Sequence, residues 1–181
     1  AIGMAICILV LLFVREELSY DRWQKDADQI YRVTGLFLDN SVKEELAVTP
    51  YPIAQTVREE LPEVMAATKL NDAWSERLFQ YEDRHFYTKN YAYVDSAFFS
   101  VFPYPFLSGN PKTVLQSPNS IVLSKKMAKR IFGEANPMGQ SIRFNNSRDC
   151  QVVGVLDETD SPSHFEYDIY FPWRNQDRAV R

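Results

Sequence analysis

Histidines are the first side chains of this sequence to consider for chemistry, because an imidazole can bind zinc or act as a general base. The chain of 181 residues has two of them, His85 and His164, which are far apart in the sequence. Each has acidic or aromatic neighbours, and no second histidine or cysteine stands at helical spacing from either. A zinc or catalytic site needs two or three convergent side chains. We therefore interpret both histidines as ordinary strand or loop residues.

Carboxylates are densest at Asp157, Glu158 and Asp160, which could in principle bind a cation. This cluster has neither the EF-hand spacing nor the glycine at which a calcium loop turns. We interpret it as a solvated loop and predict no metal site. The two thiols, Cys7 and Cys150, lie in an apolar leading segment and an apolar strand, so no disulfide within the domain is predicted.

Motifs of the common enzymes are absent from the sequence. It contains no glycine-rich phosphate loop, no GxSxG elbow, no HExxH motif and no CxxC pair. We therefore predict that the chain is not an enzyme, needs no cofactor and leaves any nucleotide to another polypeptide. The net charge of −4 and the pI of about 5.3 provide no basic surface for phosphates, so no nucleic-acid partner is predicted.

The composition is that of one globular domain, with 45% hydrophobic and 24% charged residues. An aromatic content of 14% favours strands with broad, half-buried faces. Together with the helices predicted below, this favours an α+β fold with mixed helices and strands. The averages hide one asymmetry, because the first fourteen residues carry no charge at all.

Three interpretations of this apolar segment compete. A signal peptide would need a basic flank before it and a small-residue cleavage site after it, and neither is present. A buried soluble helix remains possible, although such a helix would usually show a polar stripe. Fourteen residues are fewer than the roughly 20 that cross a bilayer as a helix. We therefore predict that residues 1–14 are the outer part of a longer, first transmembrane helix.

Residues 15–28 are predicted to be a juxtamembrane stalk that leads into a soluble domain at 29–181. Cationic and amphipathic side chains gather where a helix leaves the hydrocarbon. The candidate membrane anchor and stalk residues are Phe13, Arg15, Leu18, Tyr20 and Trp23.

The sequence of the first half of the domain predicts short strands and helices. A strand is expected over 30–38. A helix is expected after Thr49, its predicted N-cap, and Pro50, with Ile53, Val57 and Leu61 recurring every four residues. Further strands are predicted over 64–70, 77–81 and 85–94. Asp95 or Ser96 could then cap one or two helical turns.

The second half has the clearest pattern. It predicts a strand over 121–123, followed by a helix that Ser124 caps and Gly133 ends. The apolar face of this helix is Met127, Ala128, Ile131 and Phe132. Strands are predicted over 141–144, 150–156 and 168–172.

An aromatic cluster precedes this half and is formed by Phe98, Phe99, Phe102, Tyr104 and Phe106. These residues are the candidate docking interface of the domain. The alternative is that they plug the core beneath an irregular loop, as most such clusters do, and this alternative is favoured. Their exposure in the structure decides between the two.

Several short motifs, and their order along the chain, resemble those of the MacB/FtsX-type ABC transporter permeases and their MacB-like periplasmic core domain. Residues 17–23 and 27–33 resemble the exit from the first membrane helix. The later motifs are Val94-Asp95-Ser96-Ala97-Phe98-Phe99, Phe106-Leu107-Ser108-Gly109-Asn110-Pro111, Ile121-Val122-Leu123-Ser124, Arg130-Ile131-Phe132-Gly133, Asn136-Pro137-Met138-Gly139 and Val152-Val153-Gly154-Val155. The resemblance covers nearly the whole chain.

The resemblance implies a permease subunit with four membrane helices in the bacterial inner membrane, with this domain in the periplasm or extracytoplasmic space. It implies a homodimer or heterodimer, an ABC ATPase subunit, fused or separate, and a periplasmic adaptor or lipoprotein as a further partner. It also implies coupling of ATP hydrolysis to efflux or release by mechanotransmission. Family members usually continue beyond the position of Arg181, so we expect a fragment that lacks a final strand and a smaller subdomain.

The second hypothesis for the function is a membrane-anchored extracytoplasmic domain that binds a small ligand and signals through the same stalk. A pocket with convergent polar groups would favour it. An anchored enzyme is the third hypothesis, because no nucleophile, base and orienting group can be recognised in the sequence.

Overall fold

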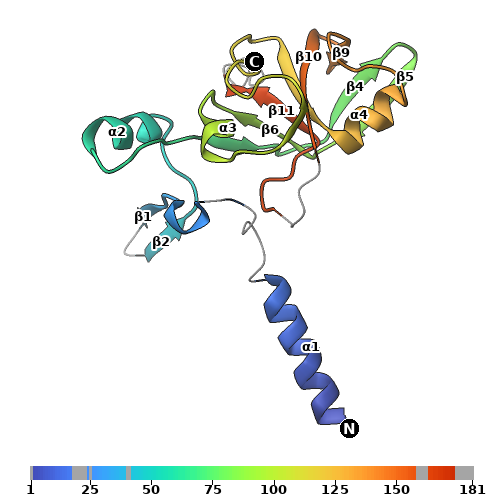
Figure 1. The fold of residues 1–181 in the computed structure, drawn as a ribbon. Helices are drawn as coiled ribbons and strands as arrows, with labels where there is room; N and C mark the ends of the chain where they lie inside the picture. The colour runs from blue at the N-terminus through green and yellow to red at the C-terminus, as the bar shows by residue number, and fades with distance from the viewer. Residues whose placement is uncertain (1, 18–23, 25, 40–41, 158–162, 174–181) are drawn as a thin grey trace.

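The computed structural model describes residues 2–17, 24, 26–39, 42–157 and 163–173. The chain begins with helix α1 (Ile2–Glu17), which extends away from the rest of the protein as a separate rod (Figure 1). Residues 2–14 carry no charge, and in the helix interior each backbone N–H bonds the carbonyl oxygen four residues earlier, so these residues need no polar partner outside the helix. Among the described residues, no helix combines the length and the apolar character that crossing a membrane requires.

A short 3₁₀ turn, η1 (Ala27–Gln29), precedes a hairpin of strands β1 (Gly35–Asp39) and β2 (Val42–Leu46). The two strands are antiparallel and form a two-stranded sheet of their own. The predicted strand over 30–38 is therefore shorter at its start, because pairing with β2 begins only at Gly35.

Helix α2 (Ile53–Glu60) confirms the helix predicted after Thr49 and Pro50, but the predicted cap is wrong. The N-cap position is Pro52, and no side chain caps the helix. The strand predicted over 64–70 is also wrong for most of its length. Pairing starts only at Leu70, which lies opposite Val94, so the preceding residues have no partner strand.

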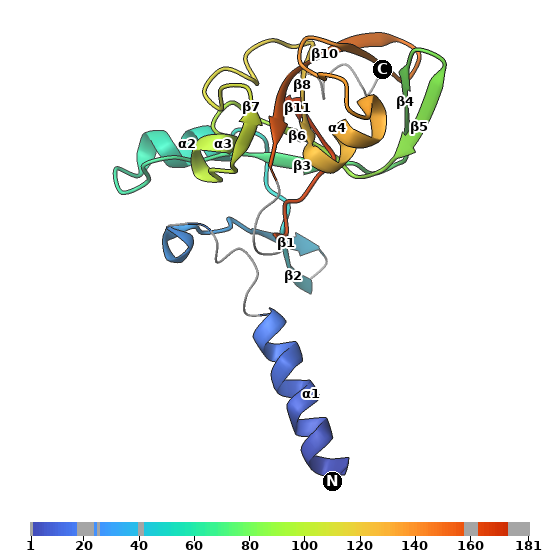
Figure 2. The ribbon, with the colours of Figure 1, turned by 45° about the vertical axis from the view of Figure 1, so that its right-hand side comes forward.

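A nine-stranded mixed sheet forms the body of the domain, in the order β3-β6-β11-β8-β10-β9-β4-β5, with β7 paired to the end of β10 (Figures 1 and 2). The strands are β3 (Leu70–Asp72), β4 (Arg77–Tyr81), β5 (Arg84–Thr88), β6 (Tyr91–Val94), β7 (Phe106–Ser108), β8 (Ser120–Ser124), β9 (Ser141–Phe144), β10 (Arg148–Leu156) and β11 (Ile169–Pro172). The sheet and helices confirm the predicted mixed α/β fold.

The single strand predicted over 85–94 is two strands in the structure, β5 and β6, because the chain turns between Thr88 and Tyr91. The hydroxyl of Thr88 stabilises this turn by accepting a hydrogen bond from the Asn90 N–H at 3.0 Å. The two halves then pair with different neighbours, β5 with β4 and β6 with β11 and β3.

Strands β8 and β10 are parallel, and helix α4 (Lys125–Phe132) lies in the connection between them. The hydroxyl of Ser124 caps this helix by accepting from the Met127 N–H at 3.1 Å. Gly133 ends the helix with a positive φ of 63°. The predicted start and end of this helix are thus confirmed.

Alternation along the strands gives the sheet two apolar faces. On β8, Ile121 and Leu123 belong to one core cluster, and Val122 belongs to the other. The first cluster also contains Met127 and Ile131 of α4. The second cluster is completed by α3 (Phe98–Val101) and the loop that follows it. The body of the domain is therefore a sheet covered on both faces, which requires strands that are apolar on both sides.

The loop after β7 presses closely on β10. Gly109 has φ of 101°, and a Cβ atom there would lie 2.6 Å from the carbonyl oxygen of Val153. The register between β8 and β10 shifts between Val152 and Gly154, so the loop meets β10 at an irregularity of the strand. Glycine is required at position 109 by both the backbone angle and the space.

Candidate functional site

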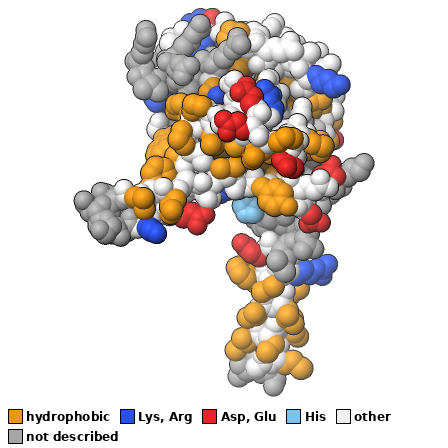
Figure 3. Space-filling view, turned by 90° about the vertical axis from the view of Figure 1, so that its left-hand side faces the viewer, with side chains coloured by type: hydrophobic (Ala, Val, Ile, Leu, Met, Phe, Trp, Pro, Cys, Tyr) orange, Lys and Arg blue, Asp and Glu red, His pale blue; other side chains and the backbone are white. Residues whose placement is uncertain are grey.

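The candidate anchor residues lie on or just after α1. Residues 3–15 of this helix are all exposed, including Phe13 at 65% and Arg15 in the last turn. Figure 3 shows hydrophobic side chains along the face of the helix that is turned to the viewer. The other candidates, Leu18, Tyr20 and Trp23, lie outside the described residues. The apolar surface of α1 is thus not part of the core of the domain.

The candidate interface aromatics lie in the core. Phe98, Phe99, Phe102 and Tyr104 are at most 8% exposed and belong to the second core cluster. Phe106 is half-buried against the same cluster. The hypothesis of a docking surface is therefore wrong for the four buried rings, and the alternative of a core plug is correct. The rings are buried because α3 and its loop fold back over β6 and β11.

Two buried tyrosines of this cluster organise the segment before β11. The hydroxyl of Tyr104 donates to the carbonyl oxygen of Phe165 at 3.1 Å and shares a hydrogen bond with Ser163 at 3.0 Å. The hydroxyl of Tyr170 donates to the same Phe165 oxygen at 2.7 Å. Burial raises the pKa of Tyr170 well above its ordinary value, so its hydroxyl remains a donor.

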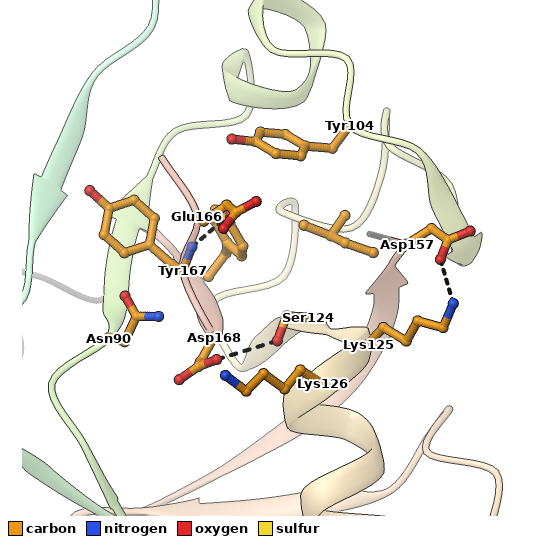
Figure 4. A pocket seen from close by; sticks show the side chains of 11 residues that line it. Asn90, Tyr104, Ser124, Lys125, Lys126, Asp157, Glu166, Tyr167 and Asp168 are labelled. Atoms are coloured by element: carbon orange, nitrogen blue, oxygen red, sulfur yellow. Dashed lines mark hydrogen bonds and ion pairs between the residues drawn. The ribbon is translucent and has the colours of Figure 1, made fainter. Parts of the chain in front are cut away.

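A groove of about 310 Å³ lies where several strands end, and many of its lining residues are polar or charged (Figure 4). It is open at the carboxyl ends of β8 and β10, the position where open α/β sheets commonly bind ligands. The chain segments before β6 and β11 complete it. Its lining residues are Asn90, Tyr104, Ser124, Lys125, Lys126, Leu156, Asp157, Glu166, Tyr167, Asp168 and Tyr170.

Both signs of charge line this groove. Lys125 and Lys126 come from the start of α4, and Lys125 forms an ion pair with Asp157 at 2.9 Å. Glu166 and Asp168 come from the segment before β11 (Figure 4). A groove with this lining can offer hydrogen bonds and charge contacts to a small polar molecule.

The aliphatic hydroxyl among the lining residues is that of Ser124, and it is held by structural contacts. It accepts from the Met127 N–H as the helix cap, and it approaches Asp168 Oδ1 at 3.5 Å. The lining residues include no histidine and no cysteine. The described lining therefore provides no activated nucleophile of the Ser–His or Cys–His type.

The remaining candidates for chemistry lie apart. His85 is exposed on β5, and His164 is exposed in the segment before β11. Asp157 lies in the groove, whereas Glu158 and Asp160 lie outside the described residues. Within the part of the chain that the structure describes, no group of three or more side chains could hold a metal ion.

Sequence reasoning missed the groove, although it identified some of its parts. Ser124 was recognised as a helix cap, and Asp168 as the start of a strand. The signal that could have found the groove is the pair of parallel strands around a helix, because their carboxyl ends form one edge. Lys126 and Glu166 belong to no motif that would have indicated a site.

Exposed apolar side chains gather between Tyr31 and Trp74. They include Leu36 and Leu38 of the hairpin, at 62% and 70%, and Met65 and Trp74, both at 89%. The face of the molecule that includes α2 shows hydrophobic side chains with acidic ones among them (Figure 3). Residues 31–76 contain four basic and eight acidic residues, so this segment is acidic as well as apolar.

Comparisons with known proteins agree with this fold. A solved domain of a Porphyromonas gingivalis protein assigned as a permease superposes with a TM-score of 0.63 at 18% identity, over 74% of this chain and 56% of that one. The periplasmic region of MacB from Actinobacillus actinomycetemcomitans gives a TM-score of 0.50 at 23% identity, over 66% and 53%. The chain thus spans a little over half the length of these solved domains.

Comparison of the sequence with curated proteins gave no match. The family profile of the MacB-like periplasmic core domain, by contrast, matches residues 1–181, the whole chain. This match agrees with the resemblance carried by the short motifs. The chain belongs to the MacB-like periplasmic core domain family, and it is a periplasmic domain of the kind that MacB-like ABC transporter permeases carry.

Proposed function

We propose that this domain couples ATP hydrolysis in the cytoplasm to the efflux or release of a substrate outside the inner membrane. In this proposal it makes no chemical step of its own. An ABC ATPase subunit drives two permease copies, and α1 transmits the movement to the domain as part of a membrane helix and stalk. A periplasmic adaptor or lipoprotein is the further partner of such an assembly.

The exposure of α1 carries the proposal. Thirteen successive residues, 3–15, are exposed although the helix is almost entirely apolar, and none of them belongs to either core cluster. A helix that is apolar on all sides is stable only where lipid or protein surrounds it. The charge of Arg15 at its last turn suits the boundary between lipid and water.

The packing of the domain supports its role as a body that moves as a unit. The central strands β6, β8 and β11 are buried on both faces, with Val94, Ile121, Val122 and Ile169 at 0% exposure. Close-packed interiors have low compressibility and transmit displacement rather than absorbing it. A displacement applied at one edge of this sheet would therefore reach the other edge.

The test uses the full permease with its ATPase in lipid nanodiscs and compares two variants at one position of α1. Val14→Pro removes a backbone donor and kinks the helix, which costs roughly 3 kcal/mol of helix stability. Val14→Ala at the same position keeps the helix and serves as the control. A spin label at Lys129, on the exposed side of α4, reports the distance between the two permease copies with and without trapped ATP.

The wild type and Val14→Ala should show an ATP-dependent change of this distance. Val14→Pro should hydrolyse ATP but lose the distance change. A Val14→Pro complex that changes its distance as the wild type does would overturn the relay through α1. The substitution Leu18→Pro, just after the described helix, is expected to uncouple hydrolysis from movement in the same way.

The groove at the ends of β8 and β10 favours a second candidate function, ligand binding with signalling through the stalk. Its mixed charges suit a small polar molecule that carries both an ammonium and a carboxylate group. Amino acids and dipeptides are suitable probes in a thermal-shift assay of the chain. A probe that raises the Tm of the wild type but not of Asp168→Asn would place this second function ahead of the first.

A further inference from the structure

The N-terminal segment, residues 27–69, has few attachments to the sheet. Helix α2 has no buried residue, and β1 and β2 pair with each other. From this segment, Ile30 packs against the second core cluster, where it is half-buried. Any movement that arrives from α1 must pass through this segment, so the contacts that do attach it to the sheet determine what reaches the sheet.

The indole of Trp173 makes the first of these contacts. It packs edge-on against the ring of Tyr51, with the ring centroids 5.3 Å apart. The ammonium of Lys69 lies over the same indole, 4.5 Å from its centroid. A cation over an indole face is attracted by the ring quadrupole. Trp173 thus contacts the N-terminal segment at two positions that are 18 residues apart.

Tyr167 makes the second contact, with the end of β3, the strand by which the N-terminal segment continues into the sheet. Its hydroxyl donates a hydrogen bond to Asp72 Oδ1 at 2.8 Å, across 95 residues of sequence. Burial, and then the hydrogen bond to Asp72, raise the pKa of Tyr167 well above its ordinary value. The phenol therefore stays protonated and keeps its role as the donor throughout the physiological pH range.

A third contact fixes the chain just before β3. The hydroxyl of Thr68 donates to Asp95 Oδ1 at 2.6 Å, and the Asp95 N–H donates to the carbonyl oxygen of Lys69 at 3.3 Å. Asp95 directly follows β6. We call Trp173, the Tyr167–Asp72 hydrogen bond and the Thr68–Asp95 hydrogen bond, together, the clasp.

Two residues of the clasp flank a central strand of the sheet. Tyr167 lies two residues before β11, and Trp173 lies directly after it. Strand β11 is parallel to β6 and antiparallel to β8, so it is a central strand, and its four residues are buried. The clasp therefore attaches Tyr51 and Lys69 of the N-terminal segment to one end of this central strand. It also attaches β3, the edge strand into which that segment continues, to the chain just before the other end.

Without the clasp, the attachment would depend largely on β3. This strand has three residues and lies at the edge of the sheet, paired with β6. A three-residue edge strand resists shear poorly, because few ladder hydrogen bonds hold it. The side chains of the clasp add resistance at both ends of β11.

We propose that the clasp is the junction through which movement of the N-terminal segment enters the sheet, and that Trp173 and Tyr167 are its positioning residues. This inference rests on the proposed mechanical relay. It adds to that relay a specific point of transfer, the two ends of β11.

The experiment places spin labels at two positions of the full permease–ATPase complex in nanodiscs. Glu60 at the end of α2 reports on the N-terminal segment, and Lys129 on α4 reports on the sheet; both are exposed. Cys7 is replaced by alanine. Cys150 is kept, because it is 1% exposed and burial raises the pKa of its thiol to about 11, which suppresses its labelling near neutral pH.

The clasp variant is Tyr167→Phe with Trp173→Leu, which removes the phenol donor and the indole. The matched control is Tyr87→Phe with Trp74→Leu, which makes the same chemical changes at side chains that are 57% and 89% exposed. We expect the clasp variant to hydrolyse ATP and to keep the ATP-dependent distance change at Glu60. It should lose the change at Lys129. The control should keep both changes.

The outcomes separate this inference from the function on which it rests. If Val14→Pro abolishes both distance changes and the clasp variant keeps both, the relay stands and the clasp is not its junction. If Val14→Pro keeps both changes, the relay itself fails. Circular dichroism and the Tm of the clasp variant establish that it is folded. If it is unfolded, Tyr167→Phe alone is measured, and a wild-type response at Lys129 in that variant would overturn the role of the hydrogen bond.

Discussion

Residues 31–74 and residues 77–173 use their apolar side chains in opposite ways. Every buried hydrophobic residue of the described chain is Phe79 or a later residue. Outside α1, all but two of the exposed large hydrophobic side chains of the described residues lie between Tyr31 and Trp74. The exceptions are Tyr87 and Leu107.

The difference is one of partners rather than of amino-acid type. Val57 on α2 and Ile131 on α4 occupy equivalent apolar faces of eight-residue helices, yet Ile131 is 0% exposed and α2 has no buried residue. Helix α4 lies in the connection from β8 to β10. Its apolar residues share a core cluster with residues of both strands, so the sheet covers this face of the helix. An amphipathic sequence favours a helix, but burial also requires a surface against which the helix can pack.

The largest predicted effect compares one apolar side chain from each region. Phe171→Ala removes a ring that is 0% exposed and contacts Phe79, Tyr91, Tyr93 and Phe144. It should lower the free energy of unfolding by about 3–5 kcal/mol. Leu38→Ala, at a side chain that is 70% exposed, should change it by less than about 0.5 kcal/mol. Urea unfolding of the chain in a mild detergent measures both, and equal losses would show that the two regions share one core.

The second prediction tests whether the irregular loop after β7 belongs with the rigid region. Gly109→Ala should lower the free energy of unfolding by about 2–3 kcal/mol, because φ is 101° and the new Cβ would meet the Val153 oxygen at 2.6 Å. Gly133→Ala, where φ is 63° and no atom lies within 4 Å, should cost about 1 kcal/mol. If the two losses were the same, the loop would be free to move away from β10.

The third prediction compares the starts of α4 and α2. Ser124→Ala removes the hydroxyl that accepts from the Met127 N–H and should cost about 1 kcal/mol. Thr49→Ala should be nearly neutral, because the cap position of α2 is Pro52 and no side chain caps that helix. The same urea titration is the measurement. A cost at Thr49 as large as that at Ser124 would contradict the difference between the two helix starts.

The smallest predicted effect is a change in how the free energy of unfolding depends on pH, and it comes from a thiol in the buried region. Burial raises the pKa of the Cys150 thiol to about 11, above its ordinary value of 9.0. The pKa of this thiol is higher in the folded state than in the unfolded state. The contribution of the protonated Cys150 thiol to stability is therefore complete below pH 9 and is lost as the pH rises through 11. Cys150→Val should therefore make the free energy of unfolding fall less steeply between pH 9 and 11.

Ile142→Val is the control for that measurement, because it alters the same buried cluster without removing a titrating group. It should lower stability at every pH and leave the slope unchanged. Identical slopes for the wild type and Cys150→Val would show that the thiol keeps its ordinary pKa in the folded state.

The sequence predicted the second half of the fold better than the first. The strands at Ser141–Phe144, Arg148–Leu156 and Ile169–Pro172 and the capped helix α4 were predicted nearly to their bounds. Their local signals and their tertiary contacts agree, since alternation, cap and turn residues all favour the observed element. In the first half, β-forming residues at 30–34 and 64–69 had no partner strand, so local preference alone did not make them strands.

The candidate site was less predictable than the fold. The aromatic residues at 98–104 could have formed either a core or a surface, and only the position of α3 over β6 and β11 decided for the core. The groove and the clasp join residues such as Asp72 and Tyr167, which are 95 positions apart. Neither residue carries a local pattern, so no spacing in the sequence could have paired them.

The sequence by itself determined which segments are apolar, where helix α4 starts and ends, and which family the chain resembles. These properties depend on neighbouring residues, through periodicity, capping and turn chemistry. The tertiary structure alone decided which apolar faces are buried and where the N-terminal segment is attached to the sheet. Those properties depend on contacts between distant residues, whose free energies exist only once the strands have been brought together in one sheet.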